Sequence, residues 1–133
     1  MIIEERRGKD ILDGGNKRIA FAINTEGFND AGFAGIISCK FWPELANCGE
    51  NPLGTVLSKK VEEVEYFALV CHSLHEGWKD QETTIKKVFD AIPGDEPVAS
   101  IAIGTGLIGI LSGADFNQIR KGMEESTKRI ILY

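Results

Sequence analysis

The hydrophobic positions of the chain fall into short apolar runs separated by amphipathic or polar stretches. Short apolar runs bounded by turn-forming residues are typical of buried strands. Five such runs occur, at Ile19–Ile23, Thr55–Lys60, Glu65–Leu74, Val98–Ile103 and Arg129–Tyr133. A turn around Glu62 and Glu63 is expected to join the second run to the third. The apolar segment Tyr66–Val70 predicts a central strand that is covered on both faces.

Three helices are predicted between these strands. The first covers Ala31–Phe41 and is stopped by Pro43, because proline disrupts a helix. The second follows Asp80 as N-cap and places four apolar residues at helical spacing, before Pro93 and Gly94 end it. These four residues are Ile85, Val88, Phe89 and Ile92.

The last predicted helix begins at a cap residue, either Asp115 or Ser112, and turns three apolar side chains inward. These side chains belong to Phe116, Ile119 and Met123. The chain is thus expected to contain about six strands and three helices in strand–helix–strand order. This order predicts an α/β layered domain. At 133 residues, against about 150 for a typical domain, residues 1–133 are expected to form a single domain.

Composition and charge narrow the function classes. There are 15 Lys and Arg residues and 20 Asp and Glu residues, with a net charge of −5. The only dense basic stretch, Arg6-Arg7-Gly8-Lys9, directly follows Glu4-Glu5, and this mixture of charges makes binding to double-stranded nucleic acid unexpected. Three cysteines without a C-x-x-C motif favour a reducing compartment. With no signal-peptide pattern and no membrane-length apolar run, a soluble cytoplasmic protein is expected.

Glycine is over-represented, at 15 of 133 residues, and two clusters directly follow predicted strands. The later cluster, Gly104-x-Gly106-x-x-Gly109, matches the dinucleotide fingerprint. That fingerprint should open a further strand–helix–strand unit with an acidic residue about 20 positions on. Only 24 residues remain after Gly109 and position 129 is arginine, so a Rossmann domain is rejected. A glycine-rich loop able to cradle a phosphate is still consistent with the sequence.

The earlier cluster, Gly27, Gly32 and Gly35, also leaves a predicted strand and enters a helix. Two such loops can meet at the crevice of an α/β sheet, where ligands bind. The alternative is that both loops are ordinary connections that need positive φ angles. The sequence leaves these two interpretations open.

Other candidate chemistry is weaker. His72 and His75, near Cys71, suggest a metal site, but on a strand positions 72 and 75 face opposite sides, so no metal is expected. No cofactor is expected, and no G-x-S-x-G nucleophile elbow occurs. Trp42 and Trp78 lie near loops, where they could stack on a base or anchor the core.

In this order along the chain, the motifs resemble the macro domain family, nearest the ADP-ribosyl-glutamate hydrolase branch. The motifs are Gly8-Lys9-Asp10-Ile11-Leu12, Ala22-Ile23-Asn24, Ala31-Gly32-Phe33-Ala34-Gly35 and Ile103-Gly104-Thr105-Gly106-Leu107-Ile108-Gly109. The resemblance covers essentially the whole chain. It implies a three-layer α/β/α fold with a mixed central sheet that binds ADP-ribose.

The resemblance also implies ligand-binding roles. Asp10 would accept a hydrogen bond from the adenine amino group. Asn24 and the loop of Gly32, Phe33, Ala34 and Gly35 would lie by the distal ribose and diphosphate. The loop of Gly104, Thr105, Gly106, Leu107, Ile108 and Gly109 would wrap the diphosphate with backbone N–H groups.

The sequence departs from the family pattern at several positions. Lys9 separates Gly8 from Asp10. The hydrolase branch uses a lysine and an aspartate at positions that match His72 and Ile108 here, and isoleucine cannot act as an acid or base. The carboxylates of Glu26 and Asp30 stand where a diphosphate would approach, and like charges there weaken binding.

Three hypotheses follow. The first is a macro-like module that binds ADP-ribose or a related nucleotide diphosphate, with no catalytic residues assigned. The second is a hydrolase that removes ADP-ribose from proteins by using His72 or Glu26. The third is a degenerate fold that serves as an interaction or oligomeric scaffold. The expected partner is a small nucleotide ligand, with no membrane partner, and the sequence leaves oligomerisation open.

Overall fold

The computed structural model describes the backbone of residues 1–133 and every side chain except that of Leu107. Its centre is a six-stranded sheet in the order β1-β6-β5-β2-β4-β3. The strands are β1 (Ile2–Glu5), β2 (Arg18–Asn24), β3 (Val56–Val61), β4 (Val64–His72), β5 (Val98–Ser100) and β6 (Ile130–Leu132). Only β3 runs antiparallel to its neighbour, so the sheet is mixed, as predicted.

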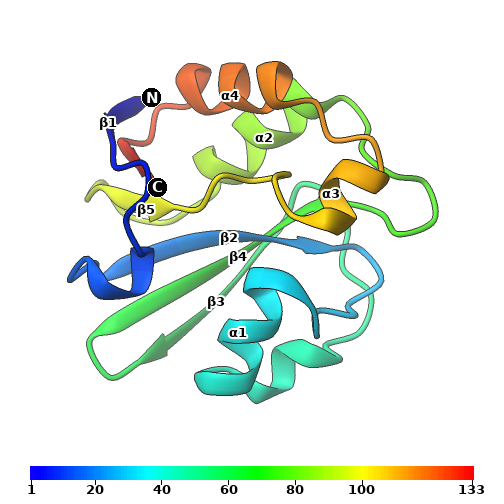
Figure 1. Ribbon diagram of the computed structural model, residues 1–133, viewed down its shortest axis with the longest axis horizontal. Helices are drawn as coiled ribbons and strands as arrows, with labels where there is room; N and C mark the ends of the chain where they lie inside the picture. Colours follow the sequence, from blue (N-terminus) through cyan, green and yellow to red (C-terminus); the bar gives the residue numbers. More distant parts are fainter.

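Helices cover both faces of this sheet and produce three layers (Figure 1). The α-helices are α1 (Gly32–Lys40), α2 (Gln81–Asp90), α3 (Leu107–Leu111) and α4 (Phe116–Glu125), and the 3-10 turns are η1 (Ile11–Asp13) and η2 (Pro43–Ala46). Helices α2 and α4 cover one face, and α1 with η2 covers the other. The α/β/α class is therefore confirmed.

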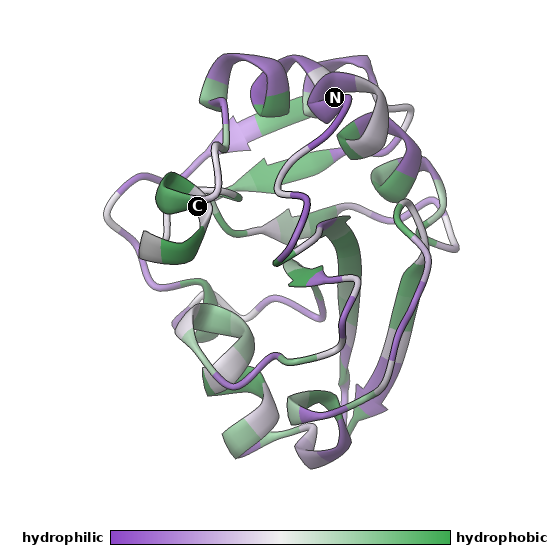
Figure 2. Ribbon diagram, turned by 90° about the vertical axis from the view of Figure 1, so that its right-hand side faces the viewer, coloured by the Kyte–Doolittle hydropathy of each residue, from purple (hydrophilic) through white to green (hydrophobic). Residues whose placement is uncertain are grey.

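The core divides in two because successive residues of a strand point to opposite faces. Along β4, Phe67 and Leu69 pack toward α2 and α4, whereas Ala68 and Val70 pack toward α1. All four side chains are fully buried. The strands of the middle layer are accordingly mainly hydrophobic in Figure 2. Trp42 is buried in the α1 half of the core.

Several element boundaries differ from the sequence prediction. Strand β4 ends at His72 because the chain turns back on itself at the Ser73–Gly77 bridge, so His75 lies in a turn and not on the strand. Strand β5 ends at Ser100, three residues early. Strand β1 adds an edge strand that the sequence analysis did not predict.

Two predicted helix features are wrong. Phe116 is 49% exposed, because it is the first residue of α4 and lies off the inward face, whereas Ile119 and Met123 are buried. Asp80 precedes α2 with a positive φ of 45° and its side chain caps nothing. Asp115 is the cap of α4, since its carboxylate accepts hydrogen bonds from the next amide nitrogens.

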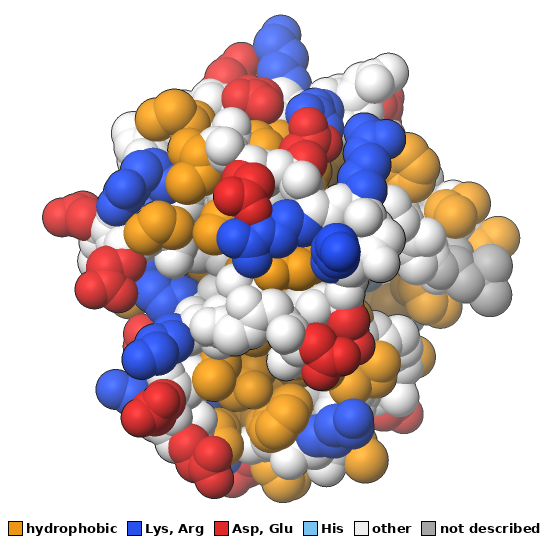
Figure 3. All heavy atoms as spheres, turned by 60° about the vertical axis from the view of Figure 1, so that its left-hand side comes forward, with side chains coloured by type: hydrophobic (Ala, Val, Ile, Leu, Met, Phe, Trp, Pro, Cys, Tyr) orange, Lys and Arg blue, Asp and Glu red, His pale blue; other side chains and the backbone are white. Residues whose placement is uncertain are grey.

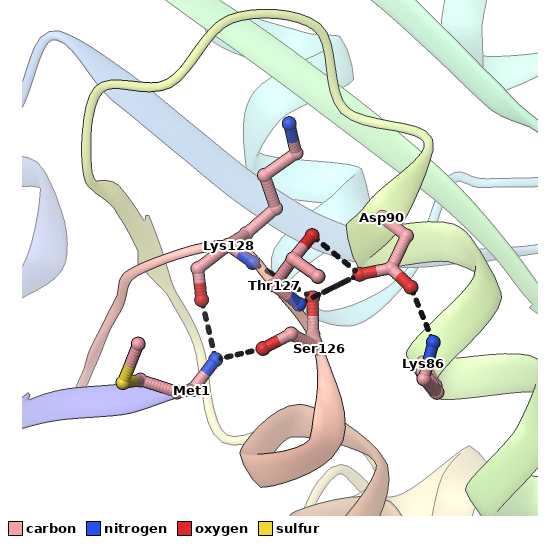
Figure 4. A network of polar contacts seen from close by, with 6 residues as sticks. All are labelled: Met1, Lys86, Asp90, Ser126, Thr127 and Lys128. Carbon is pink, nitrogen blue, oxygen red and sulfur yellow. Dashed lines mark hydrogen bonds and ion pairs between the residues drawn. The ribbon is translucent and has the colours of Figure 1, made fainter.

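A carboxylate joins the end of α2 to the segment that leads into β6 (Figure 4). The Asp90 carboxylate accepts hydrogen bonds from Lys86 Nζ and Ser126 Oγ, both at 2.7 Å, and from the Thr127 amide at 2.9 Å. Burial works to raise the pKa of Asp90, but these donors outweigh it and hold the pKa below its usual range. The same segment accepts a hydrogen bond from the Met1 amino group, through Ser126 O at 2.7 Å.

Charged side chains of both signs are interspersed on the face shown in Figure 3. One ion pair has bidentate geometry, with Arg120 donating to the two oxygens of Glu5 at 2.8 and 2.9 Å. Exposed pairs of this kind contribute little to stability. Within the described residues, no helix has the length and apolar character needed to cross a bilayer.

Candidate functional site

The carboxyl ends of β2 and β4 lie side by side at one end of the sheet, where Asn24 pairs with His72. This end of the sheet is called the carboxyl edge below. The Thr25 amide donates to His72 O at 2.9 Å, so the two strands enter their loops side by side. Ligands of open α/β sheets bind in the crevice outside the carboxyl ends of the strands. This edge is therefore the candidate site.

Asn24 is buried and holds the loop that follows β2. Its Oδ1 accepts hydrogen bonds from the amides of Gly27 (2.8 Å) and Phe28 (3.1 Å), and its Nδ2 donates to Phe28 O at 2.7 Å. Such side-chain bonds to the backbone stabilise a tight loop. Asn24 thus lies at the predicted edge, with most of its amide engaged by its own loop.

A segment distant in sequence covers this loop. Asn29 N donates to Ala46 O at 3.1 Å, Cys48 N donates to Gly27 O at 3.0 Å, and Asn51 N donates to Thr25 O at 2.9 Å. The loop amides of Thr25, Gly27, Phe28 and Asn29 therefore all donate within the protein. A phosphate at this part of the loop would have to compete with these bonds.

The glycines of the first cluster have different surroundings. Gly27 has a φ of +83°, and any side chain there would overlap the Gly49 carbonyl. Gly32, with a φ of +62°, begins α1 with open space around it. Phe33 packs against Phe21 with ring centroids 5.8 Å apart, and Ala34 is buried. Gly35 is the last predicted binding residue of this loop, and a Cβ there would lie 2.8 Å from the Asp30 backbone.

The second glycine loop closes on itself. A Cβ on Gly109 would lie 2.6 Å from Gly104 O, and a Cβ on Gly104 would lie 2.9 Å from side chains of Ala114 and Ile119. Glycine is required at position 109 because its Cα lies against the backbone of Gly104, and at position 104 because the φ there is +83° and side chains fill the space.

The remaining predicted residues of this loop differ in exposure. Gly106 faces open space. Thr105 is exposed and donates through Oγ1 to Ala102 O at 2.6 Å. Ile108 is 49% exposed. Leu107 belongs to the predicted site, but its side chain lies outside the described part of the structure.

Asp10 stands apart from the other predicted site residues. Its carboxylate accepts a hydrogen bond from the Leu12 amide at 2.9 Å and caps η1. In Figure 1, η1 lies at the end of the molecule opposite to α3. Asp10 is exposed, so its contact with an adenine amino group stays a prediction.

Glu26 ties the β2 loop to the β4 loop. Its carboxylate accepts hydrogen bonds from Ser73 Oγ at 2.7 Å and from the Leu74 amide at 2.8 Å. Burial works to raise the pKa of Glu26, but these hydrogen bonds outweigh it and hold the pKa at about 2. The group is therefore ionised at neutral pH and acts as a poor base.

The variant Glu26→Gln tests this tie through the pH dependence of stability. The pKa of Glu26 is about 2 in the folded protein, below its usual value of 4.5, so the ionised carboxylate favours folding. Its contribution is full above pH 4.5 and is lost as the pH falls toward 2. We expect wild type to melt higher than Glu26→Gln at pH 7, and the two melting temperatures to converge as the pH falls from 4.5 toward 2. A difference that is constant over this range would contradict the assignment.

His72 is the least expected group at this edge. Its side chain is buried, with the residue 7% exposed, and it stacks on Trp78 at 4.6 Å and an interplanar angle of 8°. Neither Nδ1 nor Nε2 has a hydrogen-bond partner within the described chain. Burial lowers the pKa of His72, and the nearby Glu26 carboxylate opposes that shift. The imidazole is therefore neutral at pH 7.

Next to Glu26 the edge opens into an acidic pocket of about 670 Å³. Its lining includes Glu26, Glu50, Glu76 and His75 and contains no lysine or arginine. Among the described residues, no group of three or more His, Cys, Asp or Glu side chains could hold a metal ion. The negative charge of this lining disfavours an anion in the pocket.

The sequence analysis predicted a site at this edge, but it missed two structural features there. The cover formed by residues 46–51 has no local signature, because it depends on contacts between two loops. The burial of His72 depends on Trp78, which lies beyond the Ser73–Gly77 turn. Two histidines and a tryptophan in one short stretch are a weak signal of such a stack.

Comparison with known proteins gives a fold and no sequence family. No protein-family model matches the sequence, and no curated protein matches it. Among solved structures, the Mycobacterium tuberculosis DarG macrodomain aligns with a TM-score of 0.71 at 13% identity. The alignment covers 100% of this chain and 97% of that one.

Two further solved structures align with most of this chain. A variant of the Oceanobacillus iheyensis macrodomain with ADPR aligns with a TM-score of 0.64 at 15% identity, over 93% of this chain and 80% of that one. Alphavirus P23pro-zbd aligns with a TM-score of 0.67 at 16% identity, over 98% of this chain, which spans only 21% of that one. From its sheet order, its three layers and these likenesses, the chain has the macrodomain fold.

Proposed function

We propose that this protein binds ADP-ribose, or a related nucleotide diphosphate, at the carboxyl edge of its sheet. The observation that carries the proposal is the Gly104–Gly109 loop, which leaves a parallel strand and enters a helix at that edge. The tight packing of Gly109 against Gly104 fixes the loop shape. A loop that is ordered before the ligand arrives lowers the entropic cost of binding.

The fold supports the same ligand class. One solved macrodomain to which the chain is similar holds ADPR. In our proposal the diphosphate lies along the glycine loop and the ligand extends along the edge toward Asn24. Asp10 would contact the adenine, as the family resemblance implies. No catalytic residue and no cofactor are part of the proposal.

Binding is favoured over hydrolysis of ADP-ribosylated proteins. Hydrolysis needs an acid or base that can reach the bond that breaks. The Glu26 carboxylate already accepts two hydrogen bonds and has a pKa of about 2. The imidazole nitrogens of His72 are enclosed. Release of ADP-ribose from a modified test protein, lost in His72→Ala, would reverse this preference.

Calorimetric titration of ADP-ribose tests the proposal, and Gly106→Val supplies the matched variant. Gly106 has a negative φ of −69° and open space around it, so valine fits without strain but covers the loop surface. We expect wild type to bind with a Kd below about 1 mM, and Gly106→Val to bind at least about tenfold more weakly with an unchanged melting temperature. Absence of heat with wild type at about 1 mM ligand would overturn the proposal.

A further inference from the structure

The His72 imidazole is a buried polar group whose hydrogen-bonding capacity the described chain leaves unused. Both ring nitrogens are enclosed, and neither has a partner among the described residues. A buried polar group without a partner destabilises the folded protein. An apolar aromatic ring would fill the same space without this cost. The unpaired imidazole therefore points to a partner outside the chain.

The chemistry of the ring restricts that partner. A neutral imidazole has one N–H donor and one acceptor nitrogen. A hydroxyl group can satisfy either of them, because it both donates and accepts. A phosphate offers acceptors only, so it can pair with the N–H but not with the acceptor nitrogen. The ring therefore fits a sugar better than a phosphate.

Trp78 separates this ring from the glycine loop. Its indole lies parallel to the imidazole, and its Nε1 donates to Ser112 Oγ at 2.8 Å. Ser112 follows α3 and in turn donates to Ile108 O at 2.7 Å. Trp78 is thus held over His72 by one side-chain hydrogen bond to the helix that the glycine loop enters. The residue that precedes Trp78 is Gly77, which has a φ of +75°.

We infer that His72 is a ligand-binding residue, that its imidazole hydrogen-bonds a sugar hydroxyl of the bound nucleotide, and that the stacked pair of His72 and Trp78 rearranges for this contact to form, because both nitrogens are enclosed. The inference rests on the proposed function, because the sugar belongs to the ligand on the glycine loop. It gives His72 a binding role and gives Trp78, which none of the family motifs contains, a role beside it. The residue that matches the catalytic lysine position is here a binding group.

The first test is His72→Phe, which keeps an aromatic ring against Trp78 and removes both nitrogens. We expect the melting temperature without ligand to rise by about 4 °C, because a buried polar group without a partner is lost. We expect affinity for ADP-ribose to fall about tenfold, and affinity for ADP, which lacks the second ribose, to stay unchanged. His75→Phe changes the exposed histidine of the same turn and should leave the melting temperature unaltered.

The outcomes separate this inference from the proposed function. If wild type binds ADP-ribose and His72→Phe binds it equally well, the role of His72 is overturned and the proposed function stands. If wild type binds neither ADP-ribose nor ADP, both are overturned. A melting temperature of His72→Phe at or below that of wild type would show that the imidazole is satisfied in the folded protein, and this would also overturn the inference.

Trp78 fluorescence tests the rearrangement of the stacked pair. The chain has two tryptophans, and Trp42 is buried in the α1 half of the core, away from this stack. Saturation with ADP-ribose should change the emission of wild type, and the change should be absent in Trp78→Phe. An emission spectrum that is unmoved at saturation would overturn the movement of Trp78.

Discussion

Replacing Gly27 by alanine is expected to reduce the free energy of unfolding by about 3 kcal/mol or more, from strain of the left-handed backbone and from overpacking. Gly27 has a φ of +83°. Its Cα faces the backbone of Gly49, and a side chain there would overlap the Gly49 carbonyl. A carbonyl in a hydrogen-bonded segment cannot move aside as a flexible side chain can. The variant must therefore separate residues 46–51 from the loop after β2.

Gly49→Ala is a closely matched control. Gly49 has nearly the same φ, +82°, but a Cβ there meets open space. This variant carries the backbone strain without the overlap, so we expect it to cost about 1 kcal/mol. Urea unfolding of both variants gives the difference. Equal losses for the two variants would show that the contact between the two segments does not limit stability.

The second large effect is expected at Gly122 in α4, where alanine should lower the free energy of unfolding by about 2 kcal/mol through overpacking. In an exposed helix, glycine to alanine raises stability by about 1 kcal/mol. Here the sign reverses, because α4 crosses α2 at close range. A Cβ on Gly122 would lie 2.5 Å from Glu82 O and 2.8 Å from Ile85 Cβ.

Asn117→Ala, at an exposed position of the same helix, provides the comparison. It should leave stability unchanged or raise it by about 0.5 kcal/mol, because alanine has the higher helix propensity. Thermal unfolding of both variants measures the effect. A Gly122→Ala variant as stable as Asn117→Ala would mean that the two helices have room to separate.

Much of the fold could be predicted because the buried strands carry their own signal. The apolar run at Ile19–Ile23 and the solid run at Tyr66–Val70 are covered on both faces, so they show little polar alternation. Strand β1 was not predicted, because three of its four residues are exposed and give no pattern of burial. It is a strand only through its pairing with β6, and a local pattern cannot reveal that pairing.

The site was predictable only to the level of a sheet edge. The two glycine clusters marked the ends of β2 and β5, because a chain that leaves a buried strand needs a turn there. The pattern could not show that residues 46–51 would take up the amide and carbonyl groups of the first loop. Nor could it show that Trp78 would cover His72, since both facts depend on how separate loops meet in space.

The place of β1 in the sheet bears on how the protein folds. Strand β1 pairs with β6, so the residues next to each other at this edge come from opposite ends of the described chain. Contacts between residues so far apart in sequence are slow to form, because closing a long loop costs entropy. Strands β3 and β4, which are joined by a tight turn, have no such delay. The pairing of β1 with β6 is therefore expected to form late in folding, and until then one side of β6 stays open to pairing with another chain.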